Sequence, residues 1–153
     1  MCGIIGFVGN EPAAPILLDG LERMEYRGYD SAGVAVRSET AGLQVRKTKG
    51  RLQVLSDLIH GGADLEGNLG IGHTRWATHG EPNDINAHPH VSENGRIAIV
   101  HNGIIENYLE IKEHLMRQGV HFTSDTDTEV VAQLLEFHYN ECHNMLEAVG
   151  RCL

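Results

Sequence analysis

Cysteine, proline and aromatic residues are scarce in this chain. Its 153 residues include three cysteines and four prolines, and only 5% are aromatic. Cys2, Cys142 and Cys152 offer neither the even count of a disulfide framework nor the CxxC spacing of a zinc site. We therefore expect free thiols in a reducing compartment.

Positive charge and long hydrophobic runs are also lacking. Twelve lysines and arginines face 21 aspartates and glutamates, for a formal net charge of -9, which argues against a general nucleic-acid binder. The first thirty residues have no basic segment, and glycines and Asp19 interrupt their apolar stretches. This pattern predicts neither a signal peptide nor a membrane span. We expect a cytoplasmic protein that binds neither nucleic acid nor membrane.

Length and composition are those of one globular domain. With 41% hydrophobic and 22% charged residues in 153, a chain of this size buries roughly 68–70% of its unfolded surface. The sequence contains no repeat, low-complexity tract or linker that would divide it.

Hydrophobic patterning predicts a mixture of strands and helices. Segment 3–9 has the pattern of a strand, and 13–26 has a helical stripe formed by Leu17, Leu21 and Met24. Further strands are predicted at 31–36, 43–49, 69–73 and 97–101, and further helices at 52–59, from 105 to 119, from 126 to 137 and from 144 to 149.

Turn-forming residues fill the segment 78–95, between the last two predicted strands. Loops longer than about 12–15 residues are uncommon in compact domains and usually serve as lids or binding loops. This segment is therefore a candidate part of a ligand site.

Cys2 directly follows the initiator Met1, so removal of one residue makes its thiol the first side chain. An N-terminal cysteine has its own base, because the α-amine has a pKa of about 8 and can take the thiol proton. The segment 3–8 could fix the terminus as a buried strand. A chance cysteine near a frayed end is the alternative, and position alone favours that alternative.

Five blocks of sequence extend this observation. They are Cys2-Gly3-Ile4, 21–33, 73–82, 101–107 and 124–129. In content and order they resemble the signature blocks of class II glutamine amidotransferases. Within that family the chain resembles the N-terminal glutaminase domains of glutamine–fructose-6-phosphate aminotransferases. Amidophosphoribosyltransferase-type domains, the alternative, typically have glutamine in place of Tyr29 and a tyrosine-serine pair in place of Trp76-Ala77.

The resemblance implies a role for each matching residue. Cys2 would attack the side-chain amide of L-glutamine, release ammonia and form a thioester that water hydrolyses. The side-chain amide of Asn102 and the backbone N–H of Gly103 would form the oxyanion hole. Arg75 would bind the α-carboxylate of glutamine, and Asp127 its α-ammonium group.

The resemblance also implies that 75–81 closes over glutamine, with Trp76, Thr78 and His79 at the substrate. A lone tryptophan is otherwise more often found in a core. No metal or cofactor is implied for this domain. The spacing of the histidines lacks the helical or CxxC pattern of a preorganised metal site, and His88 and His90 are better explained as loop and core hydrogen-bonders.

Local sequence leaves simpler explanations open for three of these residues. Asn102-Gly103 is a common tight-turn dipeptide. Arg75 could belong to a surface ion pair, and Asp127 lies in a Thr126-x-x-Glu129 capping-box pattern at a helix start. From the residues alone, the capping explanation is the stronger one for Asp127.

The resemblance implies an α+β fold, the Ntn-hydrolase αββα sandwich, in which two antiparallel sheets pack face to face between helices. We expect 1–153 to be a partial domain that is incomplete at its C-terminus, with the sugar isomerase domains absent. Fructose 6-phosphate would be used only through those domains, and the full-length enzyme would be a homodimer. A non-catalytic truncated fragment is the alternative.

Overall fold

The computed structural model of the chain describes residues 2–76 and 81–153. Two short 3-10 helices occur at Glu25–Arg27 and His60–Gly62. In chain order the other elements are β1 (Gly3–Val8), α1 (Ala13–Glu22), β2 (Ser31–Ser38), β3 (Gly42–Lys49), α2 (Leu52–Leu58), β4 (Leu69–Arg75), β5 (His90–Val91), β6 (Ala98–Ile99), α3 (Tyr108–Arg117), α4 (Thr128–Cys142) and α5 (Met145–Cys152). Within these ranges every helix is too short or too polar to cross a bilayer.

The larger sheet has the strand order β1-β4-β2-β3, and all neighbouring strands are antiparallel. Its register pairs Gly3 with Thr74 and Ser31 with Arg75. The start of β1 therefore lies beside the end of β4. This register places Cys2 next to the residues that follow β4.

Helix α1 covers one face of this sheet because its apolar residues recur at helical spacing. Leu17 and Leu21 are completely buried and belong to one cluster with Val34 and Val36 of β2. Gly70 in β4 makes room for the helix, since a Cβ there would lie 2.8 Å from Leu17 Cδ1. A buried apolar core thus holds the strands that lead to Cys2.

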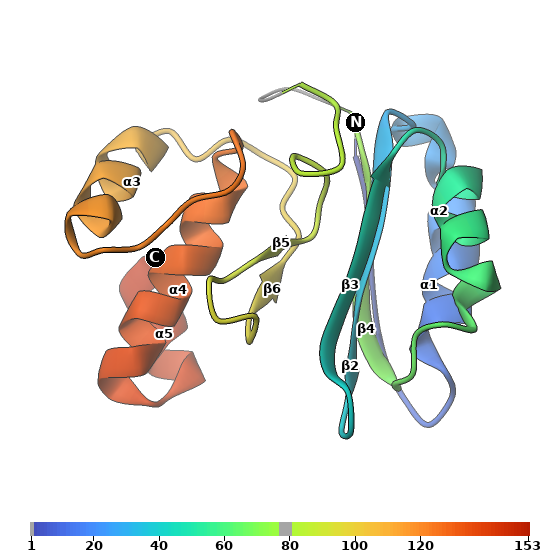
Figure 1. The fold of residues 1–153 in the computed structure, drawn as a ribbon, viewed down its shortest axis with the longest axis horizontal. Coiled ribbons are helices and arrows are strands. Elements are labelled where there is room, and N and C mark those ends of the chain that lie inside the picture. The colour runs from blue at the N-terminus through green and yellow to red at the C-terminus, as the bar shows by residue number, and fades with distance from the viewer. Residues whose placement is uncertain (1, 77–80) are drawn as a thin grey trace.

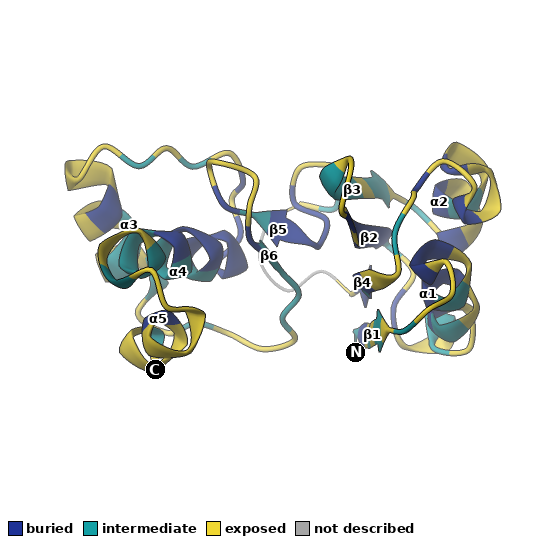
Figure 2. Cartoon of the chain, turned by 90° about the horizontal axis from the view of Figure 1, so that it is seen from below, coloured by how far each residue is buried: buried dark blue, intermediate teal, exposed yellow. Residues whose placement is uncertain are grey.

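The other face of the sheet meets a second layer, the antiparallel pair β5–β6, where His90 is paired with Ile99. Helix α4 packs on both strands, and α5 packs on α4. Figure 1 shows the resulting order of layers: α1 and α2, the large sheet, β5–β6, then α4 and α5. The buried part of α4 lies toward β5 and β6 (Figure 2). The predicted α+β sandwich of two sheets between helical layers is confirmed.

The two layers approach each other closely at Gly33. A Cβ at this residue would lie 2.0 Å from the carbonyl oxygen of His88 and 2.7 Å from the Cβ of Lys47. Only glycine allows this backbone approach. The contact fixes how far the β5 segment stands from the large sheet.

Several predicted boundaries were wrong. The strand predicted at 97–101 is only β6, and it pairs with β5 inside the predicted loop 78–95. The ladder ends there because the His101 N–H donates to the ring of His88 instead. The helix predicted to end near 26 ends at Glu22, since the next segment turns so that Glu25 accepts the N–H of Leu52 (2.9 Å).

The predicted helix from 105 was also set too early. Helix α3 begins at Tyr108, because the N–H of Ile105 donates to the Asp127 carboxylate at 2.7 Å. That tertiary hydrogen bond holds Ile105 outside the helix, although its apolar character matches the helical stripe.

Candidate functional site

A cavity of about 340 Å³ lies at the end of the large sheet where β1 begins and β4 ends. Six of the eight residues that the sequence indicated line it, and Thr78 and His79 lie outside the described residues. The lining residues are Cys2, Arg75, Trp76, His88, His101, Asn102, Gly103, Ile104, Thr126, Asp127 and Thr128. Segments far apart in sequence therefore converge on one cavity.

Cys2 is held at the start of β1. The N–H of Gly3 donates to Thr74 Oγ1 at 3.2 Å, and the N–H of Trp76 donates to Cys2 Sγ at 3.4 Å. The predicted strand is present and holds Cys2 against β4, but the expectation that it is buried was wrong, because β1 is an edge strand with Ile4 and Val8 exposed. Cys2 is thus an anchored thiol whose sulfur accepts a backbone hydrogen bond at the cavity.

Arg75 ends β4 on the face that meets the second layer. Its exposed fraction is only 4%, so it is not part of a surface ion pair. Burial lowers the pKa of its guanidinium, and the charges of Asp30, Cys2 and Asp127 oppose that effect. Because arginine stays protonated in proteins, the cavity contains a fixed positive charge.

Asp127 immediately precedes α4 and is 5% exposed. Its side chain makes no capping hydrogen bond to the helix, and Oδ2 accepts the N–H of Ile105 at 2.7 Å. Glu129 does not complete the predicted capping box either, because its carboxylate accepts the N–H of Ser124 rather than that of Thr126. The capping explanation for Asp127 was therefore wrong.

Asn102 and Gly103 follow β6 in irregular backbone at the cavity wall. The backbone N–H of His101, the residue before Asn102, donates to His88 Nδ1 at 3.4 Å. A Cβ on Gly103 would lie 2.9 Å from Nε2 of His101. The layer formed by the β5 segment therefore supports the backbone that carries both residues.

Three buried histidines separate the large sheet from the second layer. The rings of His73 and His88 stack at 4.3 Å, and His90 meets His88 edge-on at 4.6 Å. Burial lowers the pKa of His73 to about 4 and that of His90 to about 3, and it holds the pKa of His88 far below its ordinary value. The cluster is therefore uncharged near pH 7.

Hydrogen bonds explain two of these rings. His90 Nε2 lies 2.8 Å from Thr126 Oγ1, and His88 accepts from His101. The interpretation of His88 and His90 as loop and core hydrogen-bonders is confirmed. Across residues 2–76 and 81–153, no three His, Cys, Asp or Glu side chains gather in a way that could hold a metal ion.

Trp76 lies at the rim of the cavity rather than in the core. Its side chain is 47% exposed, and its ring meets Tyr29 edge-on at 5.3 Å. The common explanation of a lone tryptophan as a core residue is wrong for this chain. Its position directly precedes the segment that contains Thr78 and His79.

Sequence reasoning missed several lining residues. They are His88, His101, Ile104, Thr126 and Thr128. His88 lies in the long turn-rich segment that was suspected as a binding loop, and the others neighbour residues that the resemblance indicated. No spacing rule connects them, because the tertiary fold alone brings 88, 101–104 and 126–128 together.

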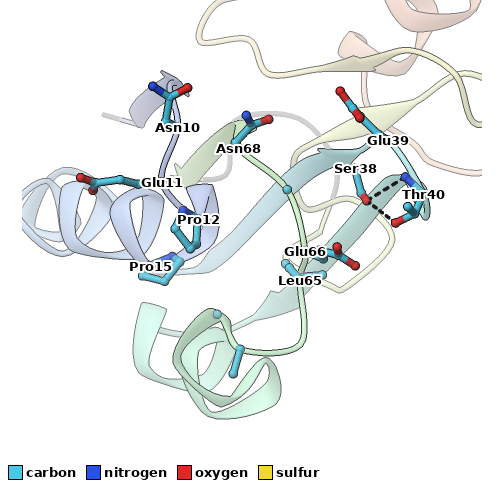
Figure 3. Close-up of a pocket in the computed structure, with 13 residues that line it drawn as sticks. Asn10, Glu11, Pro12, Pro15, Ser38, Glu39, Thr40, Leu65, Glu66 and Asn68 are labelled. Atoms are coloured by element: carbon cyan, nitrogen blue, oxygen red, sulfur yellow. Dashed lines mark hydrogen bonds between the residues drawn. The ribbon is translucent and has the colours of Figure 1, made fainter.

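A larger cavity, of about 720 Å³, lies at the opposite end of the sheet (Figure 3). Its lining includes the carboxylates Glu11, Glu39 and Glu66. Among the described lining residues there is neither a thiol nor a cationic side chain. Of these two cavities, only the smaller is lined by a described thiol and a described arginine, so it is the candidate active site.

Comparison with known proteins shows the family to which the chain belongs. The family described as "glutamine amidotransferase domain" matches residues 43–149. The glutamine–fructose-6-phosphate aminotransferase (isomerizing) of Caldanaerobacter subterraneus subsp. tengcongensis is 56% identical over 153 residues, all of this chain and 24% of that protein. An enzyme of the same name from Thermus thermophilus is 58% identical over 153 residues, all of this chain and 25% of that protein. The chain thus spans about a quarter of the length of these relatives.

A solved structure is also similar. The glutamine phosphoribosylpyrophosphate amidotransferase of B. subtilis, solved with ADP and GMP, superposes with a TM-score of 0.78 at 27% identity. The match covers 99% of this chain and 33% of that one. The fold expected from sequence therefore agrees with an independent structural comparison.

Proposed function

This chain belongs to the glutamine amidotransferase domain family, and we propose that it hydrolyses L-glutamine to L-glutamate and ammonia. One observation carries the proposal. A single cavity brings together an anchored thiol, a buried cation, a buried carboxylate and an Asn-Gly segment. Each of these groups complements one part of glutamine.

Cys2 is the proposed nucleophile. After removal of Met1, the free α-amine of Cys2 takes the thiol proton, directly or through water. The thiolate then adds to the side-chain carbonyl carbon of glutamine, and the carbonyl oxygen becomes an oxyanion. The hydrogen bonds that place Gly3 and the sulfur beside β4 support this role, because they fix the nucleophile before substrate arrives.

Asn102 and Gly103 are the proposed oxyanion hole. The side-chain amide of Asn102 and the N–H of Gly103 would donate to the oxyanion, and loss of one such donor typically costs about 10²–10³ in turnover. The intermediate collapses as the C–N bond breaks, and the ammonium group of Cys2 returns its proton to the leaving ammonia. Water then cleaves the thioester to give glutamate and the free thiol.

Arg75 and Asp127 are the proposed partners of the α-carboxylate and the α-ammonium group. Their burial supports this proposal, since paired charges gain strength when they are removed from water. We also propose Trp76, Thr78 and His79 as the residues that cover bound glutamine. The exposed position of Trp76 at the rim is the observation that supports this part.

We further propose that 1–153 acts as a glutaminase part of a glutamine–fructose-6-phosphate aminotransferase. Identities of 56% and 58% to proteins of that name, against 27% to the phosphoribosylpyrophosphate amidotransferase, favour this branch of the family. Ammonia would pass to fructose 6-phosphate, bound by sequence outside 1–153. A cytoplasmic homodimer is proposed for the whole enzyme.

The test compares three forms of the chain: wild type, Cys2→Ala and Cys142→Ala. Intact mass first shows whether Met1 has been removed, and glutamate production is then measured. We expect Cys2→Ala to lose more than about 10³-fold in turnover, while Cys142→Ala, a thiol outside the cavity, stays near wild type. Equal turnover in wild type and Cys2→Ala would refute the proposal. A chain that lacks Met1 and is stabilised by glutamine, but makes no glutamate, would be a binding module instead.

A further inference from the structure

Asn86 is a buried amide that joins two segments bordering the cavity. Its side chain belongs to a residue only 1% exposed. Oδ1 accepts the N–H of Asp125 at 3.0 Å, and Nδ2 donates to the carbonyl of Glu81 at 3.0 Å. Glu81 is the first described residue after 77–80, and Asp125 lies two residues before Asp127.

The segment that carries Asn86 is held from both sides. Lys47 Nζ, from β3, donates to the carbonyl of Ile85 at 2.9 Å and to that of Ala87 at 2.8 Å. The backbone N–H of Asn86 donates to Asn83 Oδ1 at 2.7 Å. Lys47 therefore ties the backbone on both sides of Asn86 to the large sheet, and the Asn86 side-chain amide reaches from there toward the start of α4.

We propose that Asn86 is a positioning residue that sets the Asp127 carboxylate for the α-ammonium group of glutamine. The inference deepens the proposed function and rests on it. Asp127 immediately precedes α4 and makes no capping hydrogen bond to the helix backbone; among the described residues its side chain accepts only from the N–H of Ile105 at 2.7 Å and, at 3.5 Å, from the hydroxyl of Thr128. The N–H of Asp125, which donates to Asn86, anchors the backbone two residues before Asp127, and the Glu129 carboxylate holds the two residues before that.

An amide is the group that this position requires. One end must accept from a backbone N–H and the other must donate to a backbone carbonyl, and a buried group that lost either partner would be costly. Asn86→Asp keeps the acceptor for Asp125 but places a second oxygen against the Glu81 carbonyl. Asn86→Ala releases both segments. The two variants separate the contributions of the two hydrogen bonds.

The experiment measures glutaminase kinetics of the chain with two substrates. One is L-glutamine and the other is 4-carbamoylbutanoate, which is glutamine without the α-ammonium group. We expect Asn86→Ala to raise KM for glutamine about tenfold and to change kcat less than about threefold. Discrimination between the two substrates should fall by about the same tenfold. Asn86→Asp should have a smaller effect, and Asn10→Asp, an exposed matched control at the far end of the sheet (Figure 3), should have none.

A merely structural role would lower thermal stability and active fraction but leave KM and the discrimination unchanged. An equal loss of kcat/KM for both substrates would overturn the proposal. Hydrogen exchange gives a readout that does not need activity, since the Asp125 amide should exchange faster in Asn86→Ala than in wild type. No glutamate from the wild-type chain would refute the proposed function, whereas unchanged exchange at Asp125 would refute the role of Asn86 alone.

Discussion

The two halves of the molecule bury different kinds of side chain. In the first half, one core cluster consists entirely of apolar residues drawn from 13–65. In the second half, from residue 86 onward, the buried apolar residues are fewer than the buried polar ones. The latter are Asn86, His88, His90, Ser92, Ser124, Thr126, Asp127, Thr128, Glu129, Gln133 and Glu136.

This difference indicates a division of roles: the first half supplies most of the stability, and the second half positions the backbone around the cavity. Apolar burial is strong but has no direction, so the first half supplies a firm sheet whose strand ends carry Cys2 and Arg75. Hydrogen bonds are weaker on balance but fix geometry. Glu129 illustrates this in the second half, since its carboxylate accepts the N–H groups of Thr123 (2.8 Å) and Ser124 (2.6 Å) just before Asp127.

Lowering the pH should give the largest loss of unfolding free energy, because it favours protonation of the histidine cluster (His73, His88 and His90) between the two halves. Folding lowers the pKa of His73 to about 4 and that of His90 to about 3, below the unfolded value of about 6.5. The unfolded chain therefore binds more protons in this range, and stability is complete above about pH 6.5 and lost as pH falls toward 4. For His73 alone the loss of unfolding free energy reaches about 3 kcal/mol below pH 4, and about 2 kcal/mol of it falls between pH 7 and pH 5. Denaturant unfolding from pH 7 to pH 5 measures it.

Two variants control this prediction. His73→Gln removes a titrating ring and should flatten the dependence of unfolding free energy on pH between 6.5 and 5. His121→Gln changes an exposed histidine paired with Glu93 and should leave that slope nearly as in wild type. Parallel slopes in all three proteins would show that the cluster does not couple folding to protons.

Leu21→Ala should give the next largest effect, and it acts on the apolar half. The side chain is fully buried against the sheet, with its Cδ1 only 3.0 Å from the Cβ position of Gly72. We expect a loss of about 3–4 kcal/mol of unfolding free energy, from lost burial and the cavity left behind. At a temperature where the variant is folded, KM for glutamine should not change. Leu109→Ala, on an exposed part of α3, should cost less than about 0.5 kcal/mol.

Glu129→Gln tests the polar half with a change of almost no volume. Its carboxylate accepts at both oxygens, and the amide nitrogen of glutamine cannot accept, so at least one donor of Thr123 or Ser124 loses its partner. The expected cost is about 2 kcal/mol. Unlike Leu21→Ala, it should also raise KM, because it loosens the backbone before Asp127. Glu113→Gln, an exposed counterpart, serves as control, and a stability loss without a KM change would break the proposed division between the halves.

The sequence predicted most of the apolar half because hydrophobic spacing determines its elements, although the end of α1 depends on the hydrogen bond from Leu52 to Glu25. The stripe of Leu17 and Leu21, and the strand predicted at 31–36, each correspond to an element of the structure. The polar half was predicted less well. Its boundaries depend on distant hydrogen bonds, such as Asp127 to the N–H of Ile105, and local pattern carries no signal for a partner 22 residues away.

The candidate site shows the same division. Resemblance between sequence blocks indicated Cys2, Arg75 and Asp127, which the structure brings to one cavity. It gave no reason to choose Asn86, whose significance is its pair of bonds to Glu81 and Asp125. Spacing along the chain reports on periodic elements, whereas a clamp between two irregular segments becomes visible only once those segments are placed.

Gly150→Ala should give the smallest change in unfolding free energy, and it should stabilise the protein. This glycine lies in α5 with no atom within 4 Å of a Cβ built there, so alanine gains helix propensity worth about 0.5–1 kcal/mol without a clash. Gly61→Ala is the matched control, because its surroundings are equally open but its φ is +66°. There alanine should destabilise, since the left-handed region disfavours a Cβ. Denaturant midpoints that shift in opposite directions would show that α5 unfolds together with the apolar half. An unchanged midpoint for Gly150→Ala would mean that α5 unfolds separately.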